Sequence, residues 1–445
     1  MADDSTARVE LRDQEYCSVG IARRVSRHSR STAVFSCFCV QAGTPVRLQA
    51  GGTTVTSLAV LQDGRDAKTA LYKFAVNQQK IEQLEETQRY VEGLLKKVDQ
   101  LISASCGRLP LRAKIHRDIM LFNKPRILVY LRQLQAQLVD CRTLCDNNRS
   151  DDVAEEAQAV IEELEQFQKS TAGELIADRA REGRALPGYR SSECERELQH
   201  TISRLVAYTV SVRFLIQARK MWPRLFKSFK VSFMPSSNPS PRVFRKKSGT
   251  AEGIIGRMSS KPQTLKTFKQ FVQTLQGFDL DARIMGQYEN PKFRPIVHSE
   301  LLLLNWLQNS GGIRPERFFD GYMFIGASKP TCRLCHYYVE EHPSAVNVRA
   351  THGNLYLNWR FPDVLVANGP EAIAARDAMV EGVLDRIRDD AFDMVKRKLP
   401  SSYKHHDSNT FSARLTAVDT TTVDESVAGD VDDVTSLMGD MGIGN

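Results

Sequence analysis

Apolar residues in the C-terminal third of the chain follow the periods of helices and strands in turn. Residues 301–307 are apolar on nearly every side of a helix, so we expect this helix to be covered on both sides. Residues 293–297 and 321–326 read as extended segments, and residues 345–350 alternate as a strand with one exposed face. A helix between two such strands implies a parallel crossover. From residue 370 onward, a 3–4 spacing indicates one or two closing amphipathic helices. Together these elements predict an α/β fold with helices on both faces of a mixed sheet.

Residues 69–228 carry the pattern of a mainly helical region. Apolar positions keep a 3–4 spacing from residue 84 to residue 101, flanked by Glu and Lys. Further helices are predicted at 127–145, 153–167 and 194–222, with Pro110, Pro125 and Pro187 as punctuation. Residues 1–68 are less informative, although residues 46–55 resemble a small β-hairpin around Gly51-Gly52. We therefore expect a small β element at residues 1–68, followed by a helical region.

Charge is distributed unevenly along the chain. Between residues 213 and 269 there are fourteen Lys and Arg against one acid, Glu252, a net of +13. The interleaved aromatic residues are Phe214, Trp222, Phe226, Phe229, Phe233 and Phe244. Cations among aromatic rings suit phosphate contact and base stacking, but a Pro- and Ser-rich stretch at 235–241 suits a plain linker equally well. We treat residues 229–283 as a basic linker and keep both interpretations.

The C-terminal tail has the opposite charge. Residues 401–445 hold eight acids against Lys404 and Arg414, a net of −6. Segments of this composition bury too little apolar surface to fold, so we expect a disordered acidic tail.

The most specific chemical signal lies at His298 and Glu300, followed about thirty residues later by Cys332 and Cys335. One imidazole and two thiolates can hold Zn²⁺ and leave a fourth position for water. Glu300, two residues from the imidazole, is then a non-ligand carboxylate placed to move protons.

The helix that carries the cysteines is expected to begin just before them. Ser328 is a good capping residue and Pro330 fits a first-turn position. Free N–H groups in that first turn would stabilise thiolates, and a spacing of three places both sulfurs on one face.

Four other interpretations of these residues stay open. The cysteines could form a redox pair, or a closed structural zinc site with His336 or His342 as fourth ligand. Cys332 to His336 also fits the c-type haem attachment pattern, but that attachment occurs in exported compartments. Glu300 could be an ordinary charge at a helix end, although a structural site has no use for a carboxylate there.

On these motifs, residues 293–363 resemble the zinc-dependent nucleic-acid and nucleotide deaminase superfamily, whose signature is H-x-E followed by P-C-x-x-C. The local sequence is most similar to a fungal branch related to bacterial toxin-type deaminases. The resemblance implies a three-layer α/β/α cytidine-deaminase-like domain at residues 284–400. One departure is that Thr331 separates Pro330 from Cys332. This puts the substrate pocket in question, because residues before the first cysteine usually line it in the family.

The resemblance also implies a mechanism and a set of site residues. Metal-activated hydroxide would attack cytosine C4 or adenine C6, with Glu300 as proton carrier and His298, Cys332 and Cys335 as zinc ligands. The polar and aromatic stretch at 351–359 could stack a flipped base. The candidate substrate-contacting residues are Thr331, Tyr356 and Trp359. The predicted function is therefore deamination of a base in nucleic acid, with a free nucleoside or nucleotide deaminase and a non-catalytic zinc-stabilised interaction protein as alternatives.

Composition and termini suggest where such a protein works. No run of eighteen apolar residues is present, the first residues lack an export pattern, and nine cysteines show no disulfide-framework spacing. We expect an intracellular protein of the cytoplasm or nucleus that makes no membrane contact. Single-stranded DNA or RNA would bind through residues 213–269, and a protein partner or a second copy through the helical region. If the helical region and the domain at residues 284–400 are independent, removal of the metal should destabilise residues 284–400 and leave the helical region folded.

Overall fold

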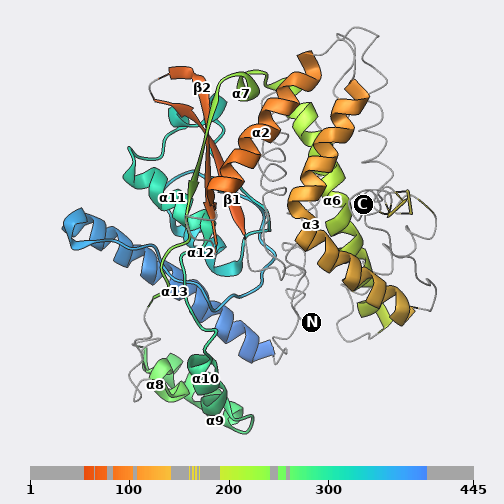
Figure 1. The fold of residues 1–445 in the computed structure, drawn as a ribbon. Coiled ribbons are helices and arrows are strands. Elements are labelled where there is room, and N and C mark those ends of the chain that lie inside the picture. Colours follow the sequence, from red (N-terminus) through yellow and green to blue (C-terminus); the bar gives the residue numbers. More distant parts are fainter. Residues whose placement is uncertain are drawn as a thin grey trace, which may run out of the picture.

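A five-stranded mixed sheet forms the centre of the computed structural model (Figure 1). The structure describes residues 55–397, with gaps at residues 65, 78–83, 104–107, 142–159, 161–162, 165, 168–169, 171–190, 241–248 and 257–260. The strands lie in the order β3-β2-β1-β4-β5. Their bounds are Thr56–Asp63 for β1, Asp66–Val76 for β2, Phe229–Met234 for β3, Phe324–Ala327 for β4 and Asn347–Val348 for β5.

The pairing of the strands joins distant parts of the chain. β1 and β2 form an antiparallel hairpin, β3 pairs parallel to β2, and β4 pairs antiparallel to β1. β5 lies parallel to β4, with helix α12 (Arg333–Glu341) between them in the chain. The predicted parallel crossover is therefore confirmed, and it occupies one edge of the sheet.

Helices cover both faces of the sheet. On one face lie α2 (Leu84–Ser103), α3 (Arg108–Cys141) and α6 (Ser191–Met221), with the short helix α7 (Arg224–Lys227) leading into β3. On the other face lie α11 (Ser299–Asn309), α12 and α13 (Pro370–Arg397), as Figure 1 shows. The result is the predicted mixed α/β architecture with helices on both faces.

Strand β1 shows why both faces must be covered. Leu58 and Val60 pack into the core shared with α2, α3 and α6, whereas Ala59 and Leu61 pack into the core shared with α11 and α12. Successive side chains of a strand point to opposite faces, so the four consecutive apolar residues of β1, at 58–61, need a layer on each side.

The first domain boundaries predicted from the sequence need correction. The boundary at residue 69 falls inside β2, so the region expected to be helical begins with a strand. The sheet under α11 and α12 takes β1, β2 and β3 from residues 56–234, far before the expected start at residue 284. The local signals of the β1–β2 hairpin, an apolar run at 58–61 followed by Asp63-Gly64, were overlooked. The pairing of β1 with β4 could not be read from the sequence, because pairing between distant segments leaves no local signal. The hairpin expected at 46–55 and the acidic tail at 401–445 lie outside the described residues, apart from Val55.

Residues 229–283 are not a linker throughout. They contain β3, α8 (Ala251–Ile255), α9 (Pro262–Gln276) and the start of α10 (Leu280–Glu289). A small core of Ala251, Ile255, Phe268 and Val272 holds these helices together, and Phe392 of α13 packs against it. Short 3₁₀ helices lie at Pro315–Arg317, Phe319–Gly321 and Val366–Asn368.

Aromatic rings in the basic segment are part of the core. Phe214, Trp222 and Phe226 are 4%, 8% and 2% exposed and belong to the core that α2, α3 and α6 share with β1 and β2. The interpretation that these rings stack on bases is therefore wrong. Four of the cations also form ion pairs: Arg219 with Asp99, Arg224 with Asp320, Lys230 with Asp63 and Lys269 with Glu252. Phosphate contact by the remaining cations stays a prediction.

Among the described helices, none has a stretch both long and apolar enough to cross a bilayer.

Candidate metal centre

The first half of the site lies at the start of α11. His298 occupies the N-cap position with extended backbone angles, and its side chain makes no capping hydrogen bond. A residue outside the helix provides the cap instead, because the Ser299 N–H donates to the side-chain oxygen of Asn77 at 2.8 Å. The imidazole is therefore free to face the cysteines across the space between α11 and α12.

The second half lies at the start of α12. Cys332 is itself the N-cap residue, and its sulfur accepts a hydrogen bond from the Cys335 N–H at 3.4 Å. The prediction that this helix begins near Ser328 and Pro330 is wrong. Ser328 instead continues the β1–β4 ladder, where its hydroxyl accepts from Thr56 N–H at 3.1 Å. Capping by sulfur still places both thiols where helix N–H groups stabilise negative charge.

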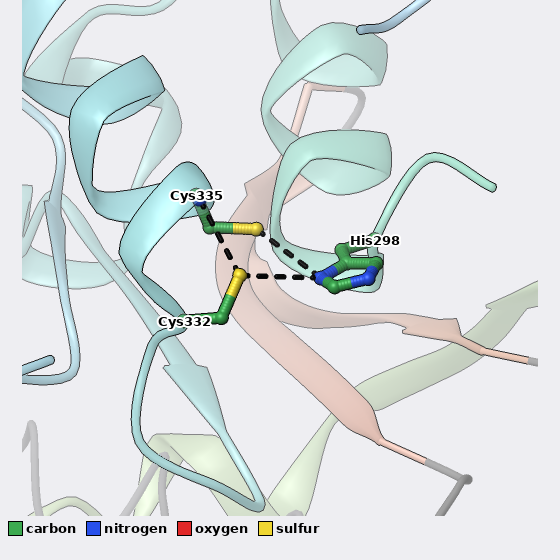
Figure 2. A group of neighbouring side chains, drawn as sticks. All are labelled: His298, Cys332 and Cys335. Atoms are coloured by element: carbon green, nitrogen blue, oxygen red, sulfur yellow. Dashed lines mark hydrogen bonds between the residues drawn. The ribbon is translucent and has the colours of Figure 1, made fainter. Parts of the chain in front are cut away.

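Figure 2 shows the imidazole of His298 facing both sulfurs. His298 Nδ1 lies 3.5 Å from Cys332 Sγ and 3.4 Å from Cys335 Sγ, and the three potential ligand atoms lie within 4.8 Å of one another. Tetrahedral zinc with its usual bond lengths to nitrogen and sulfur separates such a pair by roughly 3.5 Å. The donor set and its spacing fit zinc. Both cysteines are buried and His298 is partly exposed.

No fourth protein ligand joins this group among the described residues. His336 pairs with Glu340, and His342 hydrogen-bonds Ser344, so neither of the histidines considered for a closed structural site belongs to the cluster. Three protein ligands with a free position are the arrangement of catalytic rather than structural zinc sites.

The thiols and the imidazole shift one another's protonation. Hydrogen bonds from Cys335 and His298 hold the pKa of Cys332 well below its usual value, whereas burial raises the pKa of Cys335. Burial alone would lower the pKa of His298, but the hydrogen bond and charge of Cys332 outweigh it and raise that pKa. A bound dication would favour the thiolate form of both cysteines and neutral imidazole.

Surrounding groups affect the protonation of the ligands. The backbone carbonyl of Asn358 lies close enough to the His298 ring to help raise the pKa of the imidazole. The Trp359 indole N–H is buried and makes no well-aligned hydrogen bond. Burial raises the pKa of the Cys335 thiol, and the nearby Trp359 N–H partly offsets this by lowering it. Asn358 thus favours the charged form of the His298 imidazole, and Trp359 that of the Cys335 thiol.

Glu300 lies in the same first turn of α11 as the imidazole. Its side chain is 4% exposed, which excludes a solvated charge at a helix end. Burial raises the pKa of its carboxyl, with opposing effects from the His298 charge and from the Ser299 hydroxyl. The carboxylate is not a member of the ligand group. A buried, non-ligand carboxyl with a raised pKa beside a metal site is suited to accepting and returning a proton.

The three residues predicted to contact substrate have different positions. Thr331 is fully buried, and its hydroxyl donates to the Arg349 carbonyl while its N–H donates to Ala350 O at 3.1 Å. It extends the β4–β5 pairing and offers no free hydroxyl to a substrate. Trp359 packs in the core with Phe361 at 5.0 Å between ring centroids, so it supports the site from behind.

Tyr356 is better placed for substrate contact. It is partly buried, and its ring meets His352 edge-on at 5.6 Å between centroids. Leu355 and Leu357 on either side are 52% and 50% exposed. These two leucines were not singled out from the sequence, because an exposed apolar residue in a loop cannot be told from a buried one without the fold.

Comparison with known proteins supports the class of domain. Residues 297–363 match a family model described as OTT_1508_deam-like deaminase. The matched segment contains the imidazole, the carboxylate and both cysteines of the cluster. No curated protein and no solved structure matches the chain. The geometry and the match together define a deaminase-like segment around a His-Cys-Cys group.

Proposed function

We propose that this protein is a zinc-dependent hydrolytic deaminase that acts on a base in nucleic acid. The observation that carries the proposal is the His298–Cys332–Cys335 group with Glu300 buried beside it. His298, Cys332 and Cys335 would hold the metal, and zinc when bound would acidify a water molecule in the open fourth position. The deaminase match of residues 297–363 supports the same reaction class.

Glu300 performs the proton transfers in this proposal. Its carboxylate accepts one proton of the attacking water and gives it to the ring nitrogen. It then accepts the second proton from the hydroxyl of the tetrahedral intermediate and gives it to the leaving amine. Burial among α11, β1 and the ligands keeps bulk water away from the carboxyl and keeps its pKa raised, so it can carry the proton between these steps. The net reaction replaces an exocyclic amine by a carbonyl oxygen and releases ammonia.

Two exposed cations favour a polyanionic substrate over a free nucleoside. Lys292 and Arg294 stand on the segment that leads into His298, and in the described part of the chain neither forms an ion pair. Asn358 fixes the backbone of this segment, accepting from Arg294 N–H at 2.7 Å and donating to Lys292 O at 3.0 Å. These two exposed cations lie six and four residues before His298 in the chain, which makes them candidates for phosphate contact near the site.

The testing experiment measures ammonia release and base conversion by the zinc-loaded full chain. Single-stranded DNA, single-stranded RNA and free nucleosides are offered in parallel, with Glu300→Gln beside the wild type. Conversion of an oligonucleotide that is abolished in Glu300→Gln supports the proposal. Conversion of free nucleosides alone favours the alternative enzyme. Stoichiometric zinc without conversion of any substrate favours the non-catalytic alternative.

The contribution of the two cations is tested by binding. Lys292→Ala with Arg294→Ala should weaken binding of a single-stranded oligonucleotide and reduce the slope of log K against log salt by about 1.4, or ~0.7 for each phosphate that is no longer neutralised. Lys96→Ala with Lys124→Ala removes the same charge from exposed positions on the opposite helical layer and serves as control. Equal salt slopes in the two double variants would contradict phosphate binding at residues 292 and 294.

A further inference from the structure

The turn that carries Glu300 rests on two side chains from a distant part of the chain. Ser57, in β1, places its hydroxyl oxygen 2.7 Å from that of Ser299. Asn77, directly after β2, accepts the Ser299 N–H at 2.8 Å. Ser57 and Ser299 are both fully buried, and Asn77 is 5% exposed. The first turn of α11 is therefore anchored to the central sheet by polar contacts as well as by packing.

The hydrogen-bonded serine hydroxyls lead to Glu300, the candidate proton carrier. The Ser299 hydroxyl lies 3.3 Å from Glu300 Oε2 and is its donor. A hydroxyl has one proton to give, so while Ser299 donates to Glu300 its oxygen accepts the proton of Ser57. The hydrogen bonds then run in one direction, from β1 through Ser299 to the carboxylate.

Glu300 depends on this connection for its orientation. Among the described residues, Ser299 is the one side chain that donates to its carboxylate, and the backbone N–H of Glu300 itself is the other donor. A buried carboxylate with so few partners is positioned by each of them, and a small displacement of a catalytic group costs much rate.

We infer that Ser57 is a positioning residue for Glu300 and acts through Ser299. This inference rests on the proposed function, since the orientation of Glu300 matters to catalysis only if Glu300 carries the proton. It brings β1 into the active site, although β1 lies outside the segment that matches the deaminase family.

The inference is tested without a substrate, on the full chain loaded with Co²⁺ in place of zinc. The visible absorption of Co²⁺ reports the coordination of the metal, including its open position beside Glu300. Glu300→Gln should shift this absorption. Ser57→Ala should bind one Co²⁺ per chain and shift the absorption in the same direction. Ser57→Thr keeps a hydroxyl and should restore the wild-type spectrum.

Ser211→Ala provides the matched control. Ser211 is also fully buried, but its hydroxyl donates to the Ala207 carbonyl within α6, so its removal should leave the spectrum unchanged. If Ser57→Ala does not fold, Ser299→Ala breaks the same connection from the helix side and keeps the N–H that binds Asn77. If both fold, the double variant should show no larger shift than either single one, because the two serines act in series.

The spectra distinguish a failure of the Ser57 inference from a failure of the proposed function. A shift in Glu300→Gln with a wild-type spectrum in Ser57→Ala and Ser299→Ala overturns the inference and leaves the proposed function standing. No shift in Glu300→Gln means that Glu300 does not reach the metal, which overturns both. On any substrate converted by the wild type, Ser57→Ala should lower kcat by roughly 10–100-fold with KM little changed, and Ser57→Thr should recover it.

Discussion

The carboxylate of Glu341 on α12 lies directly against the Cα of Gly382 on α13. Arg386, one turn further along α13, holds it there through a 2.6 Å hydrogen bond from Nε. A Cβ at position 382 would overlap the carboxylate and the carbons next to it. The close approach of the Cys-bearing helix to α13 therefore depends on a glycine within a helix, a position where glycine usually costs stability.

We predict that Gly382→Ala destabilises the protein by about 1 kcal/mol. Overpacking costs about 1–3 kcal/mol, and the better helix propensity of alanine offsets about 1 kcal/mol of it. Denaturant unfolding of the two proteins measures the difference. Gly93→Ala in α2, where nothing lies within 4 Å of the new Cβ, should instead be neutral or stabilising. In a Glu341→Ala background the effect of Gly382→Ala should change sign, and persistence of the destabilisation there would contradict the clash.

Metal removal is predicted to lower the stability of both helical layers together. β1 and β2 contribute side chains to the core under α2, α3 and α6 and to the core under α11 and α12, so one layer cannot unfold alone. Zinc at 1,000 times its Kd adds about 4 kcal/mol to the free energy of unfolding. A chelator that removes the zinc also removes this contribution. Calorimetry with and without a chelator should show one transition that moves downward. Two transitions, of which one keeps its midpoint temperature when the chelator is added, would instead indicate two independent domains.

Trp359→Phe is predicted to weaken zinc binding by roughly 10-fold. The substitution keeps the packing against Phe361 but removes the N–H that favours the Cys335 thiolate. Competition with a coloured chelator at neutral pH measures the affinity. Trp306→Phe is the matched control, because Trp306 lies on α11 beneath the Lys73 ammonium at 4.6 Å and does not reach the sulfurs. Equal affinities in the two variants would argue against a role for the indole N–H.

Acidification is predicted to destabilise the end of α12 through His342. Its Nδ1 accepts from Ser344 N–H at 3.2 Å, which requires an unprotonated nitrogen, and burial lowers its pKa. The unfolded chain then binds a proton near pH 6.5 while the folded chain does not, so stability present above roughly pH 6.5 is lost as the pH falls through the folded pKa. His342→Gln should lose less stability than the wild type between pH 7.5 and 5.5.

The sequence was sufficient to name the residues that gather at the candidate metal centre and the local elements around them. The imidazole and the two thiols could be named because their types and spacing match those of zinc ligands, and Glu300 because it lies two residues from the imidazole. The strands at 324–327 and 347–348 and the apolar helix at 299–309 also followed from periodicity, which depends on nearby residues alone.

The parts that could not be predicted depend on contacts between distant segments. Ser57 and Asn77 meet α11 only because β1 pairs with β4, and no pattern near residue 57 or 77 signals this. Thr331 looked like a pocket residue because it precedes the first cysteine, but the ladder with residues 349–351 uses its polar groups. The start of α12 was misplaced because Cys332 caps the helix with sulfur, a residue that capping preferences do not favour.

The pairing of β1 with β4 also bears on how the chain can fold during its synthesis. Thr56 and Ser328, which hydrogen-bond each other across this pair, are 272 positions apart. At about 5–20 residues per second, a ribosome needs roughly 15–55 s to make the residues between them. During this time the edge of β1 that later pairs with β4 has no neighbouring strand. An unpaired apolar strand edge is a site for aggregation. We therefore expect the yield of the protein to respond to chaperones that bind this edge of β1 early in translation.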